Sequence, residues 1–279
     1  MFARKSHKNE SFSKYRAGKS SHPHKSKRSF RERSGSAATR HHAEREASKK
    51  PDTSPIPASP AFLTSPIITI NVGPSRRLFA AHEDVLSLSP YFASQLCDQF
   101  FEPHTKRIEL PDEQAEIFSA VLEYLYKGDY SPQLVHNKRR DNWELEGQEE
   151  GRGGAEPTIV DQETGEDILK DTAVYCAATR FSLPSLSALA LRKQGLQTGI
   201  QCSTILSSAR FAYTNTPDTD SKLRAHYLAL IIRSRATFKR SGTMQKEMER
   251  GGVLFFDLFV AMCNHMDDIT AAAHKSPHF

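Results

Sequence analysis

His82 is a residue whose neighbours in the sequence are of the types found in metal-binding and proton-transfer sites. His82 stands directly before Glu83 and Asp84, and an imidazole beside two carboxylates can bind a metal ion or transfer a proton. A zinc site needs two or three further ligands, and no other histidine or cysteine lies near His82 at ligand spacing. The sequence therefore predicts no metal site at His82, and a neutral imidazole at this position can instead join a strand end to a helix start by hydrogen bonds through both ring nitrogens.

The four cysteines lie far apart in the sequence. Cys97, Cys176, Cys202 and Cys263 form no C-x-x-C pair, which argues against a zinc ribbon or a disulfide framework and favours a reducing compartment. Cys176 lies on an apolar helix face, so we expect a buried thiol there rather than a nucleophile.

Motifs of the common enzyme classes are not found in the sequence. The glycine-rich stretches 151–154 and 251–252 lack the strand-to-helix context of a phosphate-binding loop. Neither a G-x-S-x-G elbow nor an H-E-x-x-H pair occurs. The many carboxylates of residues 131–167 are not on the rigid scaffold that paired catalytic acids need. The sequence predicts a protein that is not an enzyme and uses no cofactor.

Positive charge is concentrated at the N-terminal end. The 279 residues carry a net charge of +5, yet residues 1–50 alone contain 15 lysines and arginines against 4 glutamates, a net charge of +11. The remaining residues are mildly acidic, with a net charge of −6, so the high overall pI does not indicate that the folded part binds nucleic acid. Residues 1–61, rich in Ser, Lys, Arg and His, have too few apolar side chains for a core and are predicted to be a disordered tail.

The basic tail has three interpretations: a solvated arm, a nuclear localisation signal built on clusters such as residues 24–28, and a mitochondrial transit peptide. Nucleic acid, if bound at all, would be held only weakly by this arm. No stretch approaches the roughly 18 apolar residues of a membrane span, and no apolar signal-peptide core follows the first basic residues. We expect an intracellular protein of the nucleus or cytoplasm that does not bind membranes.

The folded part begins near Phe62 with the pattern of a small α+β unit. Apolar and polar residues alternate with a period of two at residues 68–72 and 106–110, which predicts strands there. Residues 73–75 form a turn, so residues 76–81 are expected to return as the second strand of a hairpin. A short helix is expected at residues 83–88. A second begins at the Ser89-Pro90 cap, and a third ends at Gly128.

Residues 131–167 interrupt this pattern. They contain ten acidic and four basic residues, several glycines and the only tryptophan, so we expect an acidic and mobile insertion. Helical spacing of apolar residues then continues at residues 168–181, 185–196, 203–213, 222–238 and 252–266. A long helical region therefore follows the α+β unit.

Three separated strings give this order of elements a specific resemblance. "FAAHEDVLSLSPYF", "RIELPDEQAEIFSAVLEYLYKGDY" and "AVYCAATRFSLPSLSALAL" occur in this order and resemble the BTB/POZ domain over roughly residues 66–196. The resemblance implies a short three-stranded sheet flanked by helices, with His82 as part of the framework. Ser89 and Gly128 are expected to be structural residues because they lie at helix ends. The helical region looks like the extension of fungal proteins of this kind. The domains expected are a tail at 1–61, a BTB/POZ domain at 62–197 and a helical extension at 198–279.

The resemblance implies protein–protein interaction as the function, with the chain acting as a scaffold or adaptor. In BTB proteins that bind cullins, the corresponding side of the domain meets the cullin, and the candidate partner-binding residues here are Leu96, Asp98, Phe100, Phe101 and Glu102. BTB domains often pair as homodimers, and the candidate dimer residues are Ile68, Ile70, Tyr91 and Phe92. The alternative for these four residues is that they fill the core of a single copy.

Two positions depart from the pattern of the family. The first strand starts with Ser65-Pro66-Ile67 where an aspartate is usual, and Glu83 stands where a lysine is usual. The charged pocket that recruits co-repressor peptides is therefore not expected. Two alternative functions stay open: a substrate adaptor of a cullin-type ubiquitin ligase, and a nuclear protein whose basic tail binds nucleic acid.

Overall fold

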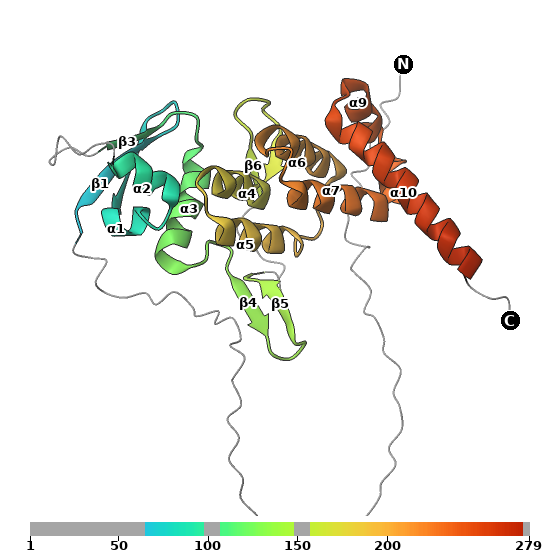
Figure 1. Cartoon of the computed structure of the whole chain (residues 1–279), viewed down its shortest axis with the longest axis horizontal. Coiled ribbons are helices and arrows are strands. Elements are labelled where there is room, and N and C mark those ends of the chain that lie inside the picture. Colours follow the sequence, from blue (N-terminus) through green and yellow to red (C-terminus); the bar gives the residue numbers. More distant parts are fainter. Residues whose placement is uncertain (1–64, 98–106, 148–156, 276–279) are drawn as a thin grey trace, which may run out of the picture. The chain divides into compact units, whose positions relative to one another are not determined.

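A mixed three-stranded sheet begins the described chain. The structure is a computed structural model that describes residues 65–97, 107–147 and 157–275. The strands of the sheet are β1 (Ile67–Val72), β2 (Arg77–His82) and β3 (Arg107–Leu110). Strand β1 lies in the middle, antiparallel to β2 and parallel to β3 (Figure 1). Alternate residues of β1 are buried, as the period of two predicts, and give the sheet one apolar inner face.

Three helices share a core with the inner face of this sheet. They are α1 (Glu83–Leu86), α2 (Pro90–Cys97) and α3 (Ala115–Lys127). Aromatic rings join the elements: the ring centroid of Phe118 lies 5.2 Å from that of Phe79 and 6.1 Å from that of Phe92. Phe181 completes the cluster, 4.8 Å from Phe92. Contacts in this range stabilise the fold beyond the burial of the rings.

The described parts of residues 131–167 fold into two hairpins, so the expectation of a mobile insertion is wrong for them. The hairpin strands are β4 (Leu134–Asn137) with β5 (Asn142–Leu145), and β6 (Thr158–Val160) with β7 (Asp167–Leu169). The guanidinium of Arg192 lies 4.5 Å from the ring centroid of Trp143 in the first hairpin. In the second, the backbone N–H of Leu169 donates to Ser208 Oγ at 2.8 Å. Distant helices therefore hold strands that composition alone does not predict.

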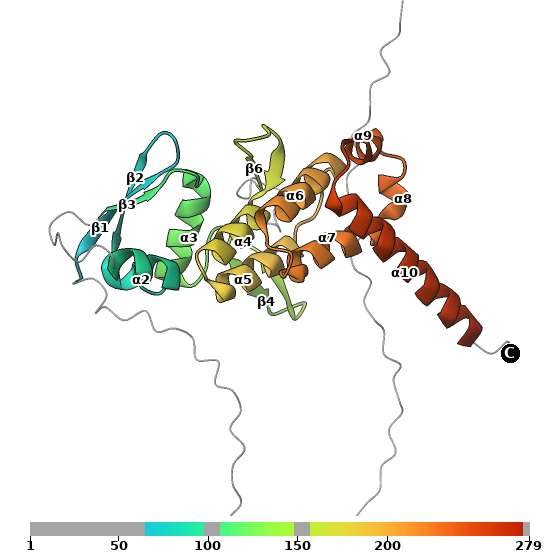
Figure 2. The same ribbon diagram turned by 45° about the horizontal axis from the view of Figure 1, so that its top comes forward.

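Seven helices make up the rest of the described chain (Figure 2). They are α4 (Lys170–Arg180), α5 (Pro184–Gln194), α6 (Cys202–Asn215), α7 (Ser221–Arg233), α8 (Arg235–Phe238), α9 (Gly242–Arg250) and α10 (Val253–Lys275). The helix expected at 222–238 is divided at Ser234, whose φ of −100° and ψ of 20° end α7. Helix α9 was not expected, because its mostly polar sequence has few apolar residues to give a periodic pattern. No described helix is long and apolar enough to span a membrane.

Helix α4 is the most enclosed of these helices. All eight of its residues from Asp171 to Ala178 are buried, and it packs against α3, α5 and α6. Its small side chains allow this close packing on several sides. The described residues belong to one compact unit, and the domain boundary expected near residue 197 stays a prediction.

Candidate protein-interaction surfaces

His82 ends strand β2 and is tied to helix α3. Its Nδ1 lies 2.8 Å from the hydroxyl of Tyr126, which also accepts a 2.9 Å hydrogen bond from the backbone N–H of His82. The following helix α1 receives no side-chain cap from the histidine. His82 therefore connects the strand to α3, and not to the helix start that the sequence suggested. Among the described residues, no group of three or more His, Cys, Asp or Glu side chains is arranged to hold a metal ion.

Ser89 and Gly128 both lie at helix ends. Ser89 Oγ accepts a 3.4 Å hydrogen bond from the N–H of Phe92 in the first turn of α2 and donates to the carbonyl of Phe181 at 2.7 Å. It therefore ties the start of α2 to the end of α4. Gly128 ends α3 with a φ of 75°, in the left-handed region that glycine adopts most readily, and its N–H donates to the carbonyl of Tyr124 at 2.7 Å.

Three of the four residues expected at a dimer interface are inside the protein. Ile68, Ile70 and Phe92 are 1%, 0% and 0% exposed, and Tyr91 is half-buried with its ring 5.3 Å from that of Phe181. This corrects the expectation: the three buried side chains fill the core of one copy, so a second copy cannot reach them. An alternating strand pattern shows that one face is buried, but it does not show what buries it.

Of the five residues expected to bind a partner, the structure describes one, Leu96. Leu96 is 4% exposed and belongs to the core, so the prediction that it contacts a partner is wrong. Asp98, Phe100, Phe101 and Glu102 lie outside the described residues.

The face of the sheet that points away from the core is open and partly apolar. Residues directly opposite each other on β1 and β2 share a face, and the outward pairs include Ile67 with His82 and Asn71 with Leu78. Ile67 and Leu78 are 66% and 71% exposed, although both are large apolar side chains. Sequence reasoning missed both residues, because it took the buried set of β1 for the interface.

Strand β3 adds polar groups to the same face. Arg107 is opposite Thr69, and Glu109 is opposite Asn71. The amide Nδ2 of Asn71 donates to Glu109 Oε1 at 2.5 Å. We call this face the sheet surface, and its outward residues are Ile67, Thr69, Asn71, Leu78, Ala80, Arg107 and Glu109. Apolar side chains beside polar ones are the usual composition of a protein-binding surface.

A buried cation lies where α3, α5 and the first hairpin meet. Lys193 is fully buried, and its Nζ pairs with the carboxylate of Asp129. The same ammonium donates to the carbonyls of Tyr130 and, at 2.8 Å, Pro132, and it lies 3.7 Å from the centroid of the Tyr130 ring. The Tyr130 hydroxyl donates to Asp171 at 2.7 Å, and burial raises the pKa of Asp171. These contacts hold the chain that leads into β4, so we assign the cluster a structural role.

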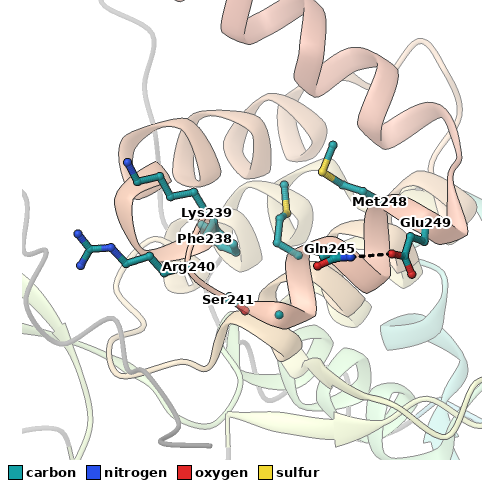
Figure 3. A pocket seen from close by; sticks show the side chains of 9 residues that line it. Phe238, Lys239, Arg240, Ser241, Gln245, Met248 and Glu249 are labelled. Atoms are coloured by element: carbon teal, nitrogen blue, oxygen red, sulfur yellow. Dashed lines mark hydrogen bonds between the residues drawn. The ribbon is translucent and has the colours of Figure 1, made fainter.

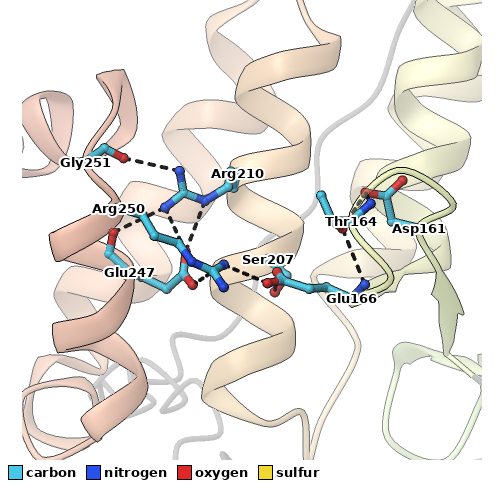
Figure 4. A network of polar contacts seen from close by, with 8 residues as sticks. All are labelled: Asp161, Thr164, Glu166, Ser207, Arg210, Glu247, Arg250 and Gly251. Carbon is cyan, nitrogen blue, oxygen red and sulfur yellow. Dashed lines mark hydrogen bonds and ion pairs between the residues drawn. The ribbon is translucent and has the colours of Figure 1, made fainter.

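A second charged network joins the β6–β7 turn to α6 and α9 (Figure 4). Arg210 donates to Glu247 Oε2 at 2.7 and 3.0 Å, and Arg250 pairs with Glu247 at 2.7 Å and with Glu166 at 2.6 Å. Ser207 Oγ donates to the second oxygen of Glu166 at 2.6 Å. That hydrogen bond and the Arg250 guanidinium lower the pKa of Glu166. Two arginines and two glutamates balance each other in this network.

Two hollows lie in the helical region of the described chain. One, of about 530 Å³, lies along α8 and α9 and has Phe238, Met244 and Met248 in its lining, while the side chains of Lys239 and Arg240 extend away from Met248 (Figure 3). The other, of about 680 Å³, is lined by α4, α5 and the α6–α7 connection. Cys176 of α4 is not part of that lining; its thiol is fully buried, and burial raises its pKa to about 12.

Residues 68–141 match the family model of the BTB/POZ domain. The match contains helices α1 to α3 and the whole sheet except Ile67, the first residue of β1, and it ends inside the β4–β5 hairpin. No curated protein matches the chain.

Proposed function

We propose that this chain is an interaction scaffold or adaptor whose BTB/POZ domain, residues 68–141, binds a partner protein through the sheet surface. BTB/POZ domains are modules of protein–protein interaction. The observation that carries the proposal is the exposure of Ile67 and Leu78 on the face of the sheet opposite the one that packs on the core. Covering two large apolar side chains that are two-thirds exposed contributes roughly 2–4 kcal/mol to binding.

The proposal is tested by changing the sheet surface and comparing the partners that bind. The full chain, a Leu78→Glu variant and a Val160→Glu variant are used to isolate partners from cells, with quantitative mass spectrometry. Val160 is an exposed apolar residue on β6 and is therefore a matched control. Partners of the sheet surface should fall at least tenfold with Leu78→Glu and should be unchanged with Val160→Glu. Equal partner sets for all three proteins would rule the sheet surface out.

A role as a cullin adaptor is the second function to test. Its support is the BTB/POZ match together with two adjacent phenylalanines, Phe100 and Phe101, in the sequence between α2 and β3. The full chain is titrated by calorimetry with the N-terminal domain of a cullin, beside a Phe100→Ala/Phe101→Ala variant and the Leu78→Glu variant. Binding that only the phenylalanine variant loses assigns the adaptor role to that segment. Absence of binding to the wild-type chain rejects the adaptor role.

Binding of nucleic acid by the basic tail is tested separately. Residues 1–50 carry a net charge of +11, and an arm of this charge would bind nucleic acid with an affinity that falls steeply as salt increases. Binding that persists after deletion of residues 1–50 would contradict a role for the tail.

A further inference from the structure

We infer that the outer face of helix α10 is a self-association surface that packs against the same face of a second copy of this chain. Helix α10 has two different sides. One side holds Leu254 and Leu258, both buried, and α10 contacts α6 and α7. Near this side the hydroxyl of Tyr213 in α6 donates to Asp257 Oδ2 at 2.9 Å. The helix is therefore fixed to the rest of the chain along one side.

The other side of α10 carries a second apolar stripe that no described residue covers. Phe256 and Phe259 are 67% and 66% exposed, and Cys263 and Met266 continue the line. Their separations of three, four and three residues are those of the seam between paired helices. From Met266 to Ala272, every residue is exposed, so this part of the helix is in contact with solvent on all sides.

The apolar area of this stripe is large enough to form the interface of a symmetric dimer. We call the outer apolar residues of α10 the α10 stripe, and its large exposed members are Val253, Phe256, Phe259, Val260, Met262, Met266 and Ile269. They are between 38% and 67% exposed. At about 150–200 Å² for a whole side chain of this size, the stripe presents roughly 600 Å² of apolar surface. An exposed apolar patch of this area is at the upper end of those found on monomeric proteins. Two copies would together bury about 1,200 Å², the lower end of stable interfaces.

The position of charge on α10 is compatible with an antiparallel pair. The acidic pair Asp267 and Asp268 lies beside the stripe, between Met266 and Ile269. In a parallel pair these acids would lie beside their own copies, which is unfavourable. In an antiparallel pair Asp268 is level with Asp257 of the second copy, which is held by Tyr213 on the side away from the stripe. A stripe from Phe256 to Ile269 that packs against itself has its two-fold axis near the midpoint, at Met262 and Cys263.

This dimer goes beyond the proposed function and does not depend on it, because the α10 stripe shares no residue with the sheet surface. The first test measures the mass of the full chain by sedimentation velocity between 1 and about 50 µM. The wild-type chain should be a dimer of twice 31.3 kDa at the upper concentrations. Phe256→Glu/Phe259→Glu should weaken the association at least a hundredfold. Leu78→Glu, which places an acid on the sheet surface, should leave it unchanged. A wild-type monomer at 50 µM, or a dimer lost with Leu78→Glu alone, would overturn the inference.

A second test is independent of the folding of the glutamate variants. Because Cys263 lies at the midpoint of the stripe, self-packing brings it close to the same residue of the partner. Cys97 is the other described cysteine that is not buried, so the test uses a Cys97→Ser background. Mild oxidation should then form a disulfide-linked dimer that Cys263→Ser abolishes. A dimer in solution that gives no Cys263 crosslink would show that another surface makes the contact, and the inference would be wrong.

Discussion

Replacement of Lys193 by methionine should destabilise the fold strongly. Methionine has a similar volume, but it leaves the carboxylate of Asp129 without its cation and the carbonyls of Tyr130 and Pro132 without their donor. Removal of one member of a buried ion pair costs about 3–5 kcal/mol. Because the side chain of Asp129 keeps 24% exposure to water, we expect the lower end, about 3 kcal/mol.

The matched control is Lys127→Met. Lys127 pairs with Glu123 at 3.0 Å in the last turn of α3, two residues before Asp129, but its side chain is 60% exposed. Exposed pairs of this kind contribute less than about 1 kcal/mol. Urea denaturation of the full chain, followed by circular dichroism, gives both free energies of unfolding. For a folded region of this size, a loss of about 3 kcal/mol lowers Tm by roughly 6–12 °C.

The double variant Lys193→Met/Asp129→Asn tests the physical reason. If the cost comes from an unpaired buried charge, removal of that charge should restore at least about 1 kcal/mol. A loss below about 1 kcal/mol for Lys193→Met, or an equal loss for Lys127→Met, would refute the reasoning that the buried pair holds the first hairpin.

The structure predicts how two further substitutions should change the stability of the fold. The Ser207 hydroxyl and the Arg250 guanidinium hold the pKa of the Glu166 carboxyl below its usual value of 4.5. The stabilising effect of the ionised carboxylate is therefore complete above that pH, and it is lost as pH falls through the lower pKa of the folded state. Tm of Glu166→Gln should be below that of the wild type at pH 7, and the difference should shrink below about pH 4.5; a difference that is constant with pH would contradict this. Gly128→Ala should cost about 1 kcal/mol in urea denaturation, because its φ is 75°, while Gly242→Ala in helix α9 should be neutral or stabilising. Open space surrounds both glycines, so equal effects would argue against a backbone origin.

Local patterns predicted the sheet and most helices because the residues that determine them are close in sequence. The period of two in β1, the serine and proline before α2 and the glycine after α3 are all local signals. The two hairpins were missed because their contacts come from Arg192, Lys193 and Ser208, far along the chain. The charge composition of residues 131–167 indicates a solvated segment, but composition does not reveal that distant helices contact this segment.

The interaction surfaces were harder to predict than the fold. The sequence shows that β1 has one apolar set of residues, but the exposed Ile67 and Leu78 are the two that break this pattern. In α10 the apolar residues are so dense that the sequence cannot separate the side that packs on α6 and α7 from the side that stays open. Which apolar residues stay exposed depends on tertiary packing, and a single sequence does not give it.

The contact between Ser89 and Phe181 has a consequence for how the chain folds as it is synthesised. Ser89 donates to a carbonyl 92 residues later, and the ring of Phe181 packs on that of Phe92, yet Phe181 lies 40 residues beyond the end of the BTB/POZ match at residue 141. A ribosome that adds about 5–20 residues per second needs roughly 2–8 s to cover that distance. During this interval the rings of Phe92 and Phe118 lack one of their neighbours. The nascent domain would then be a substrate for chaperones until helix α4 emerges.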